Sequence, residues 1–300
     1  MTPGPRIEES RARASSPPDR PRRAADLLRD VSIELSVRER GGEQLCRGFL
    51  APGTAVYINF APNDSYHEVV QAAARLKRAG FHPVPHIAAR YLASLTQFDD
   101  FLVRAVGAGV EQALIVAGDI ERPTGPFHSS LELIETGLLA KRGIRTVGVA
   151  GYPEGHPKIA TATLDAALDA KLRLLRRDDI TPYIVAQFCF EAAPIIDWLE
   201  RIRTIGVDAP VRIGLAGPAS IATLAKFAVR CGIGNSLVKL VGGQTSIARL
   251  LIEAGPDKVM RDLAATDLAG YGVAGLHVFT FGGLVRTGKW LRAALEGDLA

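Results

Sequence analysis

The stretch QALIVAGDIERPTGP, residues 112–126, joins a short apolar run to a glycine, a lone acid and a proline-containing loop. Its first part, from Gln112 to Val116, is almost continuously apolar. Such a run is typical of a strand buried on both faces, as in a parallel sheet covered by helices. The break at Gly118 then places the carboxylate of Asp119 where this strand should end. The fold depends on whether the same pattern recurs along the chain.

The pattern recurs at intervals along nearly the whole chain. Apolar runs rich in β-branched residues lie at 31–35, 55–60, 82–87, 112–118, 145–151, 181–187, 211–217 and 275–281. Helical patterns lie between most of them. Within residues 64–80, for example, Val69, Ala73 and Leu76 recur at helical spacing, and Gly80 ends the pattern. The chain therefore alternates strands with helices.

Further helices are expected at 129–143, 218–232, 243–255 and 256–272, whereas the first connection is interrupted by glycines. Alternating strand and helix with right-handed crossovers predicts a parallel α/β architecture. Eight such rounds over one chain favour a (β/α)8 TIM barrel in a single domain, and an open doubly wound sheet is the alternative.

Composition limits the class of protein. The chain has 300 residues, of which 47% are apolar and 23% charged, so it can bury a large core. Residues 1–24 are rich in Pro, Ser and Arg, which predicts a flexible tail before a barrel over 25–300. A net charge of +4 without a concentrated basic face argues against nucleic-acid binding.

The compartment is predicted from cysteine usage and from the absence of long apolar runs. Cys46, Cys189 and Cys231 are far apart in sequence and form no CxxC pair, which favours a reducing cytoplasm. No apolar run approaches the roughly 20 residues that a membrane-spanning helix needs. We therefore expect a cytoplasmic protein without membrane contact.

Polar residues follow the predicted strands repeatedly. In a barrel of this kind the active site lies where the carboxyl ends of the strands meet the following loops. The residues at these positions are Glu34, Asn59, His86, Asp119, Tyr152 and Gln187. Glu34 and Asp119 form the best chemical pair. Burial between Ile33 and Leu35 would raise the pKa of Glu34 and prepare it to donate a proton, whereas Asp119 should stay charged.

Other motifs have weaker support. GYGVAG, residues 270–275, matches a dinucleotide fingerprint but follows a predicted helix and precedes a strand, the reverse of the required order. A metal centre from His82, His86, Asp119 and His156 is a weaker interpretation than histidines used for hydrogen bonds, so we predict no metal. A lysine-dependent aldolase using Lys239 is a further alternative.

Four blocks carry a specific resemblance: PHI at 85–87, AGD at 117–119, GYPEGHP at 151–157 and AQFCFE at 186–191. In order and spacing, and in their places at strand ends, they resemble the flavin-dependent methylenetetrahydrofolate reductase family over residues 30–290. The resemblance implies a (β/α)8 barrel that holds FAD at its C-terminal face. It also implies interconversion of 5,10-methylenetetrahydrofolate and 5-methyltetrahydrofolate with NADH or NADPH as co-substrate, and an ability to form homo-oligomers.

The resemblance also implies roles for individual residues. Glu34 matches the general acid that helps to open the folate ring, and Asp119 matches the aspartate near the flavin. Gln187, Phe227 and Phe279 match substrate-binding positions. FAD-contacting positions are matched by Asn59, His86, Gly118, Asp119, Tyr152, His156, Asp165 and Lys171.

The chain also departs from the family pattern. Ala117, Phe279 and Gly283 stand where the family has arginine, tyrosine and arginine. The first-strand block, ELSVRERGG at 34–42, also lacks the aromatic residues and the proline pair of the family. The departures in the first and eighth strands motivate the alternative of a folate-binding or methyl-carrier barrel without flavin redox chemistry.

Overall fold

The computed structural model describes residues 27–39, 41–233 and 253–297. Its centre is a closed barrel in which neighbouring strands follow the order β1-β10-β7-β6-β5-β4-β3-β2. The barrel strands are β1 Val31–Ser36, β2 Ala55–Asn59, β3 His82–Ala88, β4 Gln112–Val116, β5 Thr146–Gly151, β6 Thr181–Ala186, β7 Val211–Ala216 and β10 Val273–Phe279. Parallel pairing of β1 with β10 closes the sheet, which confirms the (β/α)8 barrel and excludes the open sheet.

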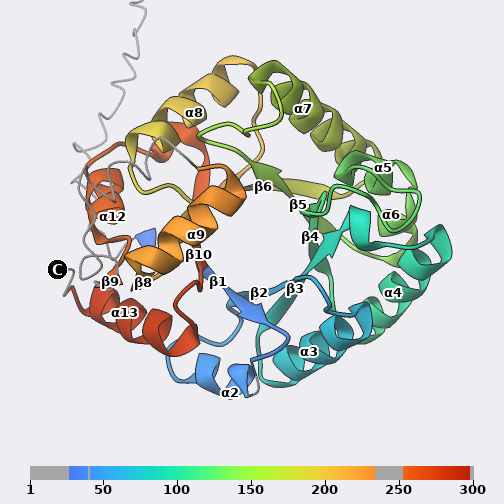
Figure 1. The fold of residues 1–300 in the computed structure, drawn as a ribbon, viewed down its shortest axis with the longest axis horizontal. Coiled ribbons are helices and arrows are strands. Elements are labelled where there is room, and N and C mark those ends of the chain that lie inside the picture. Colours follow the sequence, from blue (N-terminus) through green and yellow to red (C-terminus); the bar gives the residue numbers. More distant parts are fainter. Residues whose placement is uncertain (1–26, 40, 234–252, 298–300) are drawn as a thin grey trace, which may run out of the picture.

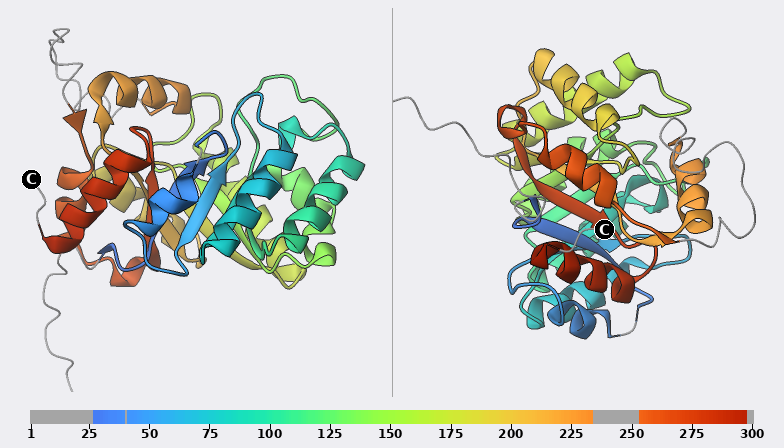
Figure 2. Two further views of the ribbon diagram at one scale, coloured as in Figure 1. Left: turned by 90° about the horizontal axis from the view of Figure 1, so that it is seen from below. Right: turned by 90° about the vertical axis from the view of Figure 1, so that its left-hand side faces the viewer.

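Helices surround this barrel as an outer layer (Figure 1). They are α2 Gly42–Arg47, α3 Tyr66–Arg78, α4 Leu95–Gly107, α5 Ser130–Glu135, α6 Leu138–Arg142, α7 Thr161–Arg177, α8 Ala193–Thr204, α9 Ile221–Cys231, α12 Asp257–Ala264 and α13 Leu284–Glu296, with short 3-10 turns η1 Ala89–Tyr91 and η2 Ala269–Tyr271. Helix α9 is the exception to the ring, because it lies across one end of the barrel (Figures 1 and 2). Among the described residues, no helix combines the length and apolar character needed to span a membrane.

Some predicted helices differ in the structure. The helix expected at 129–143 is divided into α5 and α6, because Gly137 adopts a left-handed φ of 67° that a continuous helix cannot contain. The segment expected as a helix at 218–232 begins with β8, Ala219–Ser220, before α9. The first connection, despite its glycines, contains α2.

The helix expected at 243–255 lies mostly outside the described residues. Its last part is a strand instead, since β9, Glu253–Ala254, pairs antiparallel with β8. The predicted tail, residues 1–24, also lies outside the described residues.

The barrel interior is filled by large side chains. Tyr57, Val84, Leu114, Tyr183 and Val185 form a cluster inside it, and the Tyr57 hydroxyl donates to the Tyr183 hydroxyl at 2.9 Å. Gly148 makes room for this packing, because a Cβ there would lie only 2.6 Å from Cζ of Tyr183. A filled interior leaves the ends of the strands as the place for a ligand.

Candidate active site

Glu34 is held between two histidines at the barrel opening. It lies near the end of β1, is only 7% exposed, and its Oε1 atom is 3.6 Å from Nε2 of His86 on β3. The same Oε1 atom is 3.6 Å from Nε2 of His277 on β10, a fully buried residue. Both contacts are slightly longer than a hydrogen bond. Three strands thus bring one acid and two imidazoles together.

The hydrogen bonds of His277 fix which ring nitrogen carries a proton. The Ser32 hydroxyl donates its single hydrogen to the carbonyl of Leu276 at 3.1 Å, and its oxygen also lies 3.1 Å from Nδ1 of His277. Ser32 must then accept from the Nδ1–H group, since a hydroxyl has only one hydrogen to donate. The Nε2 atom of His277 is therefore the ring nitrogen that faces Oε1 of Glu34.

The pKa of Glu34 differs from the sequence-based expectation. Burial raises it, as expected, but the contact with His277, the charges of His86 and His277 and the amide of Asn59 together lower it below the ordinary value. Glu34 is therefore ionised in the free protein. The expectation of a raised pKa was wrong because it considered only the apolar neighbours in β1 and not the imidazoles on other strands. The pKa of His86 is also lowered, but here burial is the cause: it falls from 6.5 to about 4, so the ring stays neutral at pH 7.

Some polar atoms at this opening lack a protein partner. Within the described parts of the chain, Oδ1 of Asn59 and the Nε2 atoms of His86 and His277 are buried without a hydrogen bond. A buried polar atom without a partner is costly, so such atoms often mark the place of a ligand. Asn59 ends β2 and His86 lies in the neighbouring strand β3, so both line the same part of the opening.

Asp119 lies in the loop after β4 and is held from two directions. The Tyr91 hydroxyl donates to its Oδ1 atom at 2.6 Å, and its Oδ2 atom forms an ion pair with Arg230 of α9. Gly118 adopts a φ of 91°, which turns the chain at this point. Burial raises the pKa of Asp119, but Tyr91 and Arg230 outweigh it and lower the pKa, so Asp119 is charged, as expected.

The pKa of the Cys231 thiol, in the last turn of α9, responds to several of the predicted site residues. Burial raises its pKa to about 11, against the opposing charge of Arg230. The charges of Glu34 and Asp119 add to this rise, and an interaction with Gln187 opposes it. The two acids and the amide predicted from the sequence thus all act on this one thiol at the end of α9.

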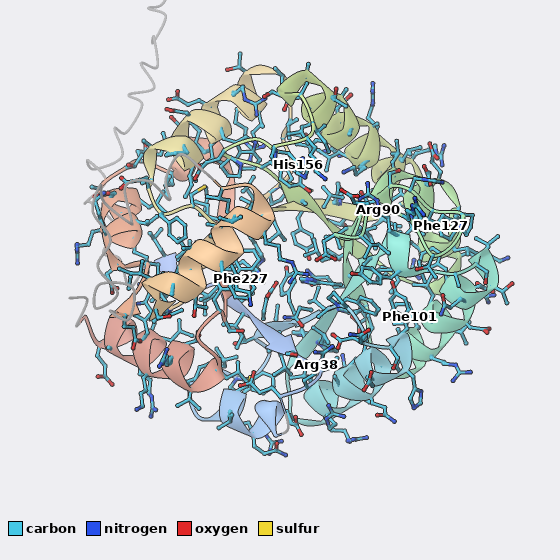
Figure 3. The ribbon with its side chains drawn as sticks, viewed as in Figure 1. Arg38, Arg90, Phe101, Phe127, His156 and Phe227 are labelled. Atoms are coloured by element: carbon cyan, nitrogen blue, oxygen red, sulfur yellow. The ribbon has the colours of Figure 1, made fainter. Side chains whose placement is uncertain are left out.

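Tyr152 and His156 form the next part of the opening. Their rings meet edge to face with centroids 5.7 Å apart, and His156 is labelled in Figure 3. Burial raises the pKa of Tyr152, and the neighbouring Cys231 adds to the rise. These two predicted cofactor residues therefore adjoin the group around Cys231.

Two predicted cofactor residues, Asp165 and Lys171, lie on α7. Asp165 forms an ion pair with Arg201 of α8. Lys171 is half-buried, and burial lowers the pKa of its ammonium group to about 8. A half-buried cation of this kind suits an anionic ligand.

An aromatic wall lines the opening beneath α9. Phe227 points from α9 toward the barrel (Figure 3), and its ring stacks on Phe281 with centroids 4.2 Å apart and an angle of 17°. Phe281 stacks in turn on Phe279 at 5.6 Å and 15°. The two phenylalanines predicted from the sequence are thus connected through a third one.

Sequence reasoning missed five residues that contribute to the opening. They are Ser32, Tyr91, Arg230, His277 and Phe281. Ser32, His277 and Phe281 lie within strands that the sequence did predict, and their inward position followed from alternation along those strands. No local pattern marks Tyr91 or Arg230, because their contacts depend on loops and on α9.

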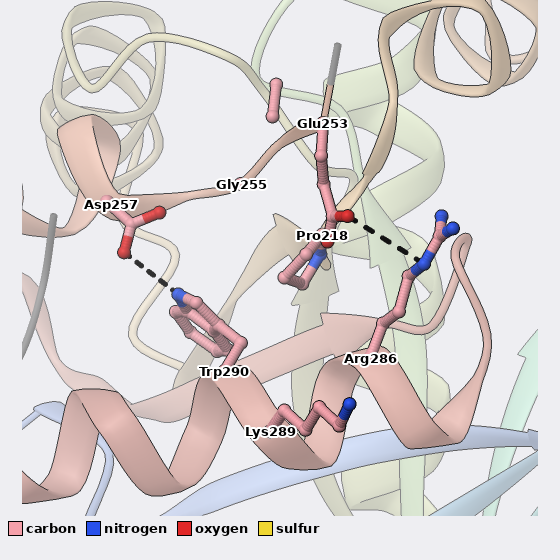
Figure 4. Close-up of a pocket in the computed structure, with 8 residues that line it drawn as sticks. Pro218, Glu253, Gly255, Asp257, Arg286, Lys289 and Trp290 are labelled. Carbon is pink, nitrogen blue, oxygen red and sulfur yellow. Dashed lines mark hydrogen bonds and ion pairs between the residues drawn. The ribbon is translucent and has the colours of Figure 1, made fainter. Parts of the chain in front are cut away.

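Two other interpretations of the sequence are a metal centre and a lysine-dependent aldolase. Within residues 27–39, 41–233 and 253–297, no group of three or more His, Cys, Asp or Glu is placed to hold a metal ion. Lys239 lies outside the described residues. A separate pocket of about 420 Å³ adjoins α13 (Figure 4), but no predicted site residue lines it. In this pocket Arg286 already forms an ion pair with Glu253 at 3.8 Å. Asp257 already accepts a hydrogen bond from the Trp290 ring at 2.9 Å.

Known proteins resemble the chain in sequence and in fold. Methylenetetrahydrofolate reductase 2 of Saccharomyces cerevisiae is 27% identical over 203 residues, which cover 62% of this chain and 32% of the relative. The 5,10-methylenetetrahydrofolate reductase of Pectobacterium carotovorum subsp. carotovorum is 23% identical over 176 residues, covering 58% of this chain and 56% of the relative. The chain therefore spans about a third to just over half the length of these relatives.

A solved structure shares the architecture. It is an uncharacterized protein from Clostridium thermocellum that binds two copies of 5-methyl-5,6,7,8-tetrahydrofolic acid, with a TM-score of 0.55 and 11% identity over 90% of this chain and 93% of that chain. At this identity the likeness shows the fold alone. The sequence itself matches the Methylenetetrahydrofolate reductase family over residues 60–281, and the chain therefore belongs to that family.

Proposed function

We propose that this chain interconverts 5,10-methylenetetrahydrofolate and 5-methyltetrahydrofolate by hydride transfer through bound FAD, with NADH or NADPH as the reductant. Family membership supports the reaction class. The observation that carries the proposal is Glu34, a buried acid at the barrel opening whose Oε1 atom lies 3.6 Å from two imidazole nitrogens. The methyltetrahydrofolate bound by the Clostridium thermocellum barrel is compatible with a folate in such an opening.

The residues present fit a flavin cofactor. The unpartnered Asn59 Oδ1 and His86 Nε2 atoms could hydrogen-bond the polar edge of the ring system. Tyr152 and His156 would flank the cofactor, and Lys171, whose burial lowers its pKa to about 8, would pair with a phosphate. When bound, FAD supplies a carrier that takes a hydride from the reduced nicotinamide and passes it to the folate. We infer that residues 25–300 form this FAD- and folate-binding unit.

Glu34 would deliver the proton that the reaction requires, after its ionised carboxylate has taken one up from solvent. As the five-membered ring of the folate opens, the bond between the methylene carbon and N10 breaks, and its electron pair stays on N10. This proton transfers from Glu34 to that nitrogen, and the methylene carbon becomes part of a cationic N5 iminium. Ser32 keeps His277 in the orientation that presents Nε2 to Glu34.

Asp119 would act on the charge that this step creates. Its carboxylate is ionised, and a negative charge near the iminium cation lowers the free energy of that cation. Hydride addition to the methylene carbon then produces the methyl group. Gln187 and the aromatic wall of Phe227, Phe279 and Phe281 would orient the folate during both steps.

The test separates the two half-reactions. Purified protein should be yellow, and anaerobic NADH or NADPH should bleach it. Addition of 5,10-methylenetetrahydrofolate should then restore the colour. Glu34→Gln should retain bleaching but lose folate-dependent reoxidation by roughly 10²–10⁴-fold, the usual contribution of a general acid. The matched control is Glu111→Gln, because the Glu111 side chain is 71% exposed and precedes β4 at the other end of the barrel.

Two outcomes would contradict the proposal. If Glu34→Gln lost bleaching and reoxidation equally, the acid role of Glu34 would be wrong. A colourless protein that binds tetrahydrofolate would instead support the alternative of a folate-binding or methyl-carrier barrel.

A further inference from the structure

Helix α9 is attached to the barrel opening at two points on its inner side. Near its middle, Phe227 stacks on Phe281 with centroids 4.2 Å apart. In its last turn, Arg230 reaches across the opening to the loop after β4 and pairs with Asp119. Figures 1 and 2 show α9 lying over the end of the barrel.

The charge that pairs with the Asp119 carboxylate comes from α9, whereas the nearby Arg90 of η1 donates to the backbone carbonyls of Gly118 and Ile120. Three titratable side chains face this carboxylate: Tyr91 from η1, and Arg230 and Cys231 from α9. Burial raises the pKa of Tyr91 to about 12 and that of Cys231 to about 11, so both are neutral at pH 7. Of these three groups, Arg230 therefore carries the charge that compensates Asp119.

We propose that Arg230 is a positioning residue, which holds α9 over the opening and compensates the charge of Asp119 until a substrate separates the two. The proposal rests on the proposed function for the role of Asp119 in the reaction. Once the pair is separated, the carboxylate is free to face the cation that forms on the folate. The position of α9 over the opening and the charge compensation of Asp119 therefore depend on the same ion pair.

The exposure of the pair agrees with an interaction that opens and closes. The side chains of Arg230 and Asp119 are 51% and 43% exposed. Ion pairs at such positions are weak and are screened by salt. The other partner of Asp119 is the neutral Tyr91 hydroxyl, which can keep the carboxylate in place when Arg230 leaves.

The first test measures hydrogen exchange of the α9 amides in the full chain by mass spectrometry. Arg230→Met should accelerate exchange roughly 1.5- to 5-fold, the range expected for a weak ion pair. Asp119→Asn should have the same effect, and the double variant should exceed neither single variant, because both remove one interaction. Lys226→Met is the matched control, since it removes an exposed cation from the same helix one turn earlier.

The Asp119 variant distinguishes this coupling from a local effect on the helix. Loss of a basic residue from the last turn of a helix can loosen it through the helix dipole alone. Asp119→Asn leaves the helix sequence unchanged, so wild-type exchange in that variant would overturn the proposal. Additive effects in the double variant would also overturn it. Salt should accelerate exchange in the wild type and leave Arg230→Met unaffected.

The second test measures the pKa of Asp119 by NMR of protein labelled with carbon-13 aspartate, with the signal assigned through Asp119→Asn. Arg230→Met should raise this pKa by at least about half a unit, and Arg230→Lys should retain most of the wild-type shift. An unchanged pKa in Arg230→Met would overturn the proposal. Neither test requires turnover, so failure of the proposed function would instead appear as absent flavin or absent hydride transfer.

Discussion

The carboxylate of Glu34 and the imidazole of His277 lie 3.6 Å apart, although the two residues come from opposite ends of the chain. They meet because β1 pairs in parallel with β10, with Ser32 opposite His277 in the register. The same pairing places the Ser32 hydroxyl at Nδ1 of His277. Closure of the barrel thus brings His277 next to Glu34 and places Ser32 where it orients the His277 ring.

Replacement of His277 should impair the proton-transfer step. In His277→Gln, Glu34 loses a contact that lowers its pKa against the effect of burial, so this pKa should rise. We expect folate-dependent reoxidation to slow about 10- to 100-fold with an altered pH profile, while reduction by NADH or NADPH continues. Stopped-flow measurements from pH 5 to 9 would check this. An unchanged profile would contradict the role of His277 in setting the pKa of Glu34.

The buried, neutral His86 should make stability depend on pH. Its pKa falls from 6.5 to about 4 on folding, so the unfolded chain binds more protons between these values. Its contribution is therefore fully present above pH 6.5 and is lost as the pH falls toward 4. Urea unfolding should show a loss of about 1–2 kcal/mol from pH 6.5 to 5. His86→Gln should reduce this loss, and an equal loss in that variant would exclude His86 as the cause.

A methyl group at Gly148 should disturb the barrel interior. In Gly148→Ala the new Cβ would lie 2.6 Å from Cζ of Tyr183, so the ring must move and its hydrogen bond with Tyr57 must change. We expect a loss of about 1–3 kcal/mol in the free energy of unfolding, as for other overpacked cores. Gly107→Ala is the control, since nothing lies within 4 Å of its Cβ. Equal stability of the two variants would show that the interior tolerates the methyl group.

The aromatic wall should behave as a unit in ligand binding. Phe227→Leu removes the ring that stacks on Phe281, and we expect the Kd for 5-methyltetrahydrofolate to rise roughly 2- to 10-fold, the usual value of one aromatic pair. Phe281→Leu should have a similar effect because it removes the support of Phe227. Calorimetric titration of both single variants and the double variant would check this. Fully additive effects would show that the two rings act independently.

The repeated units of this fold could be predicted because their signals are local. Each barrel strand is a short apolar run, and the observed bounds differ from the predicted ones by no more than a few residues. The polar residues at strand ends, such as Asn59 and Asp119, could also be placed at one end of the molecule, since parallel strands in a barrel share a direction. Errors arose at Gly137 and at β9, where one glycine conformation and one distant pairing overrode a helical pattern.

The sequence by itself determined the barrel, its family and the acid at the end of the first strand. Only the tertiary structure decided how that acid behaves. The pKa of Glu34 is lowered because His86 and His277, which are far away in sequence, converge on a single oxygen. Arg230 meets Asp119 only because α9 crosses the barrel opening. Charge interactions depend on distances through space, and these distances are set when the first and last strands pair and the barrel closes.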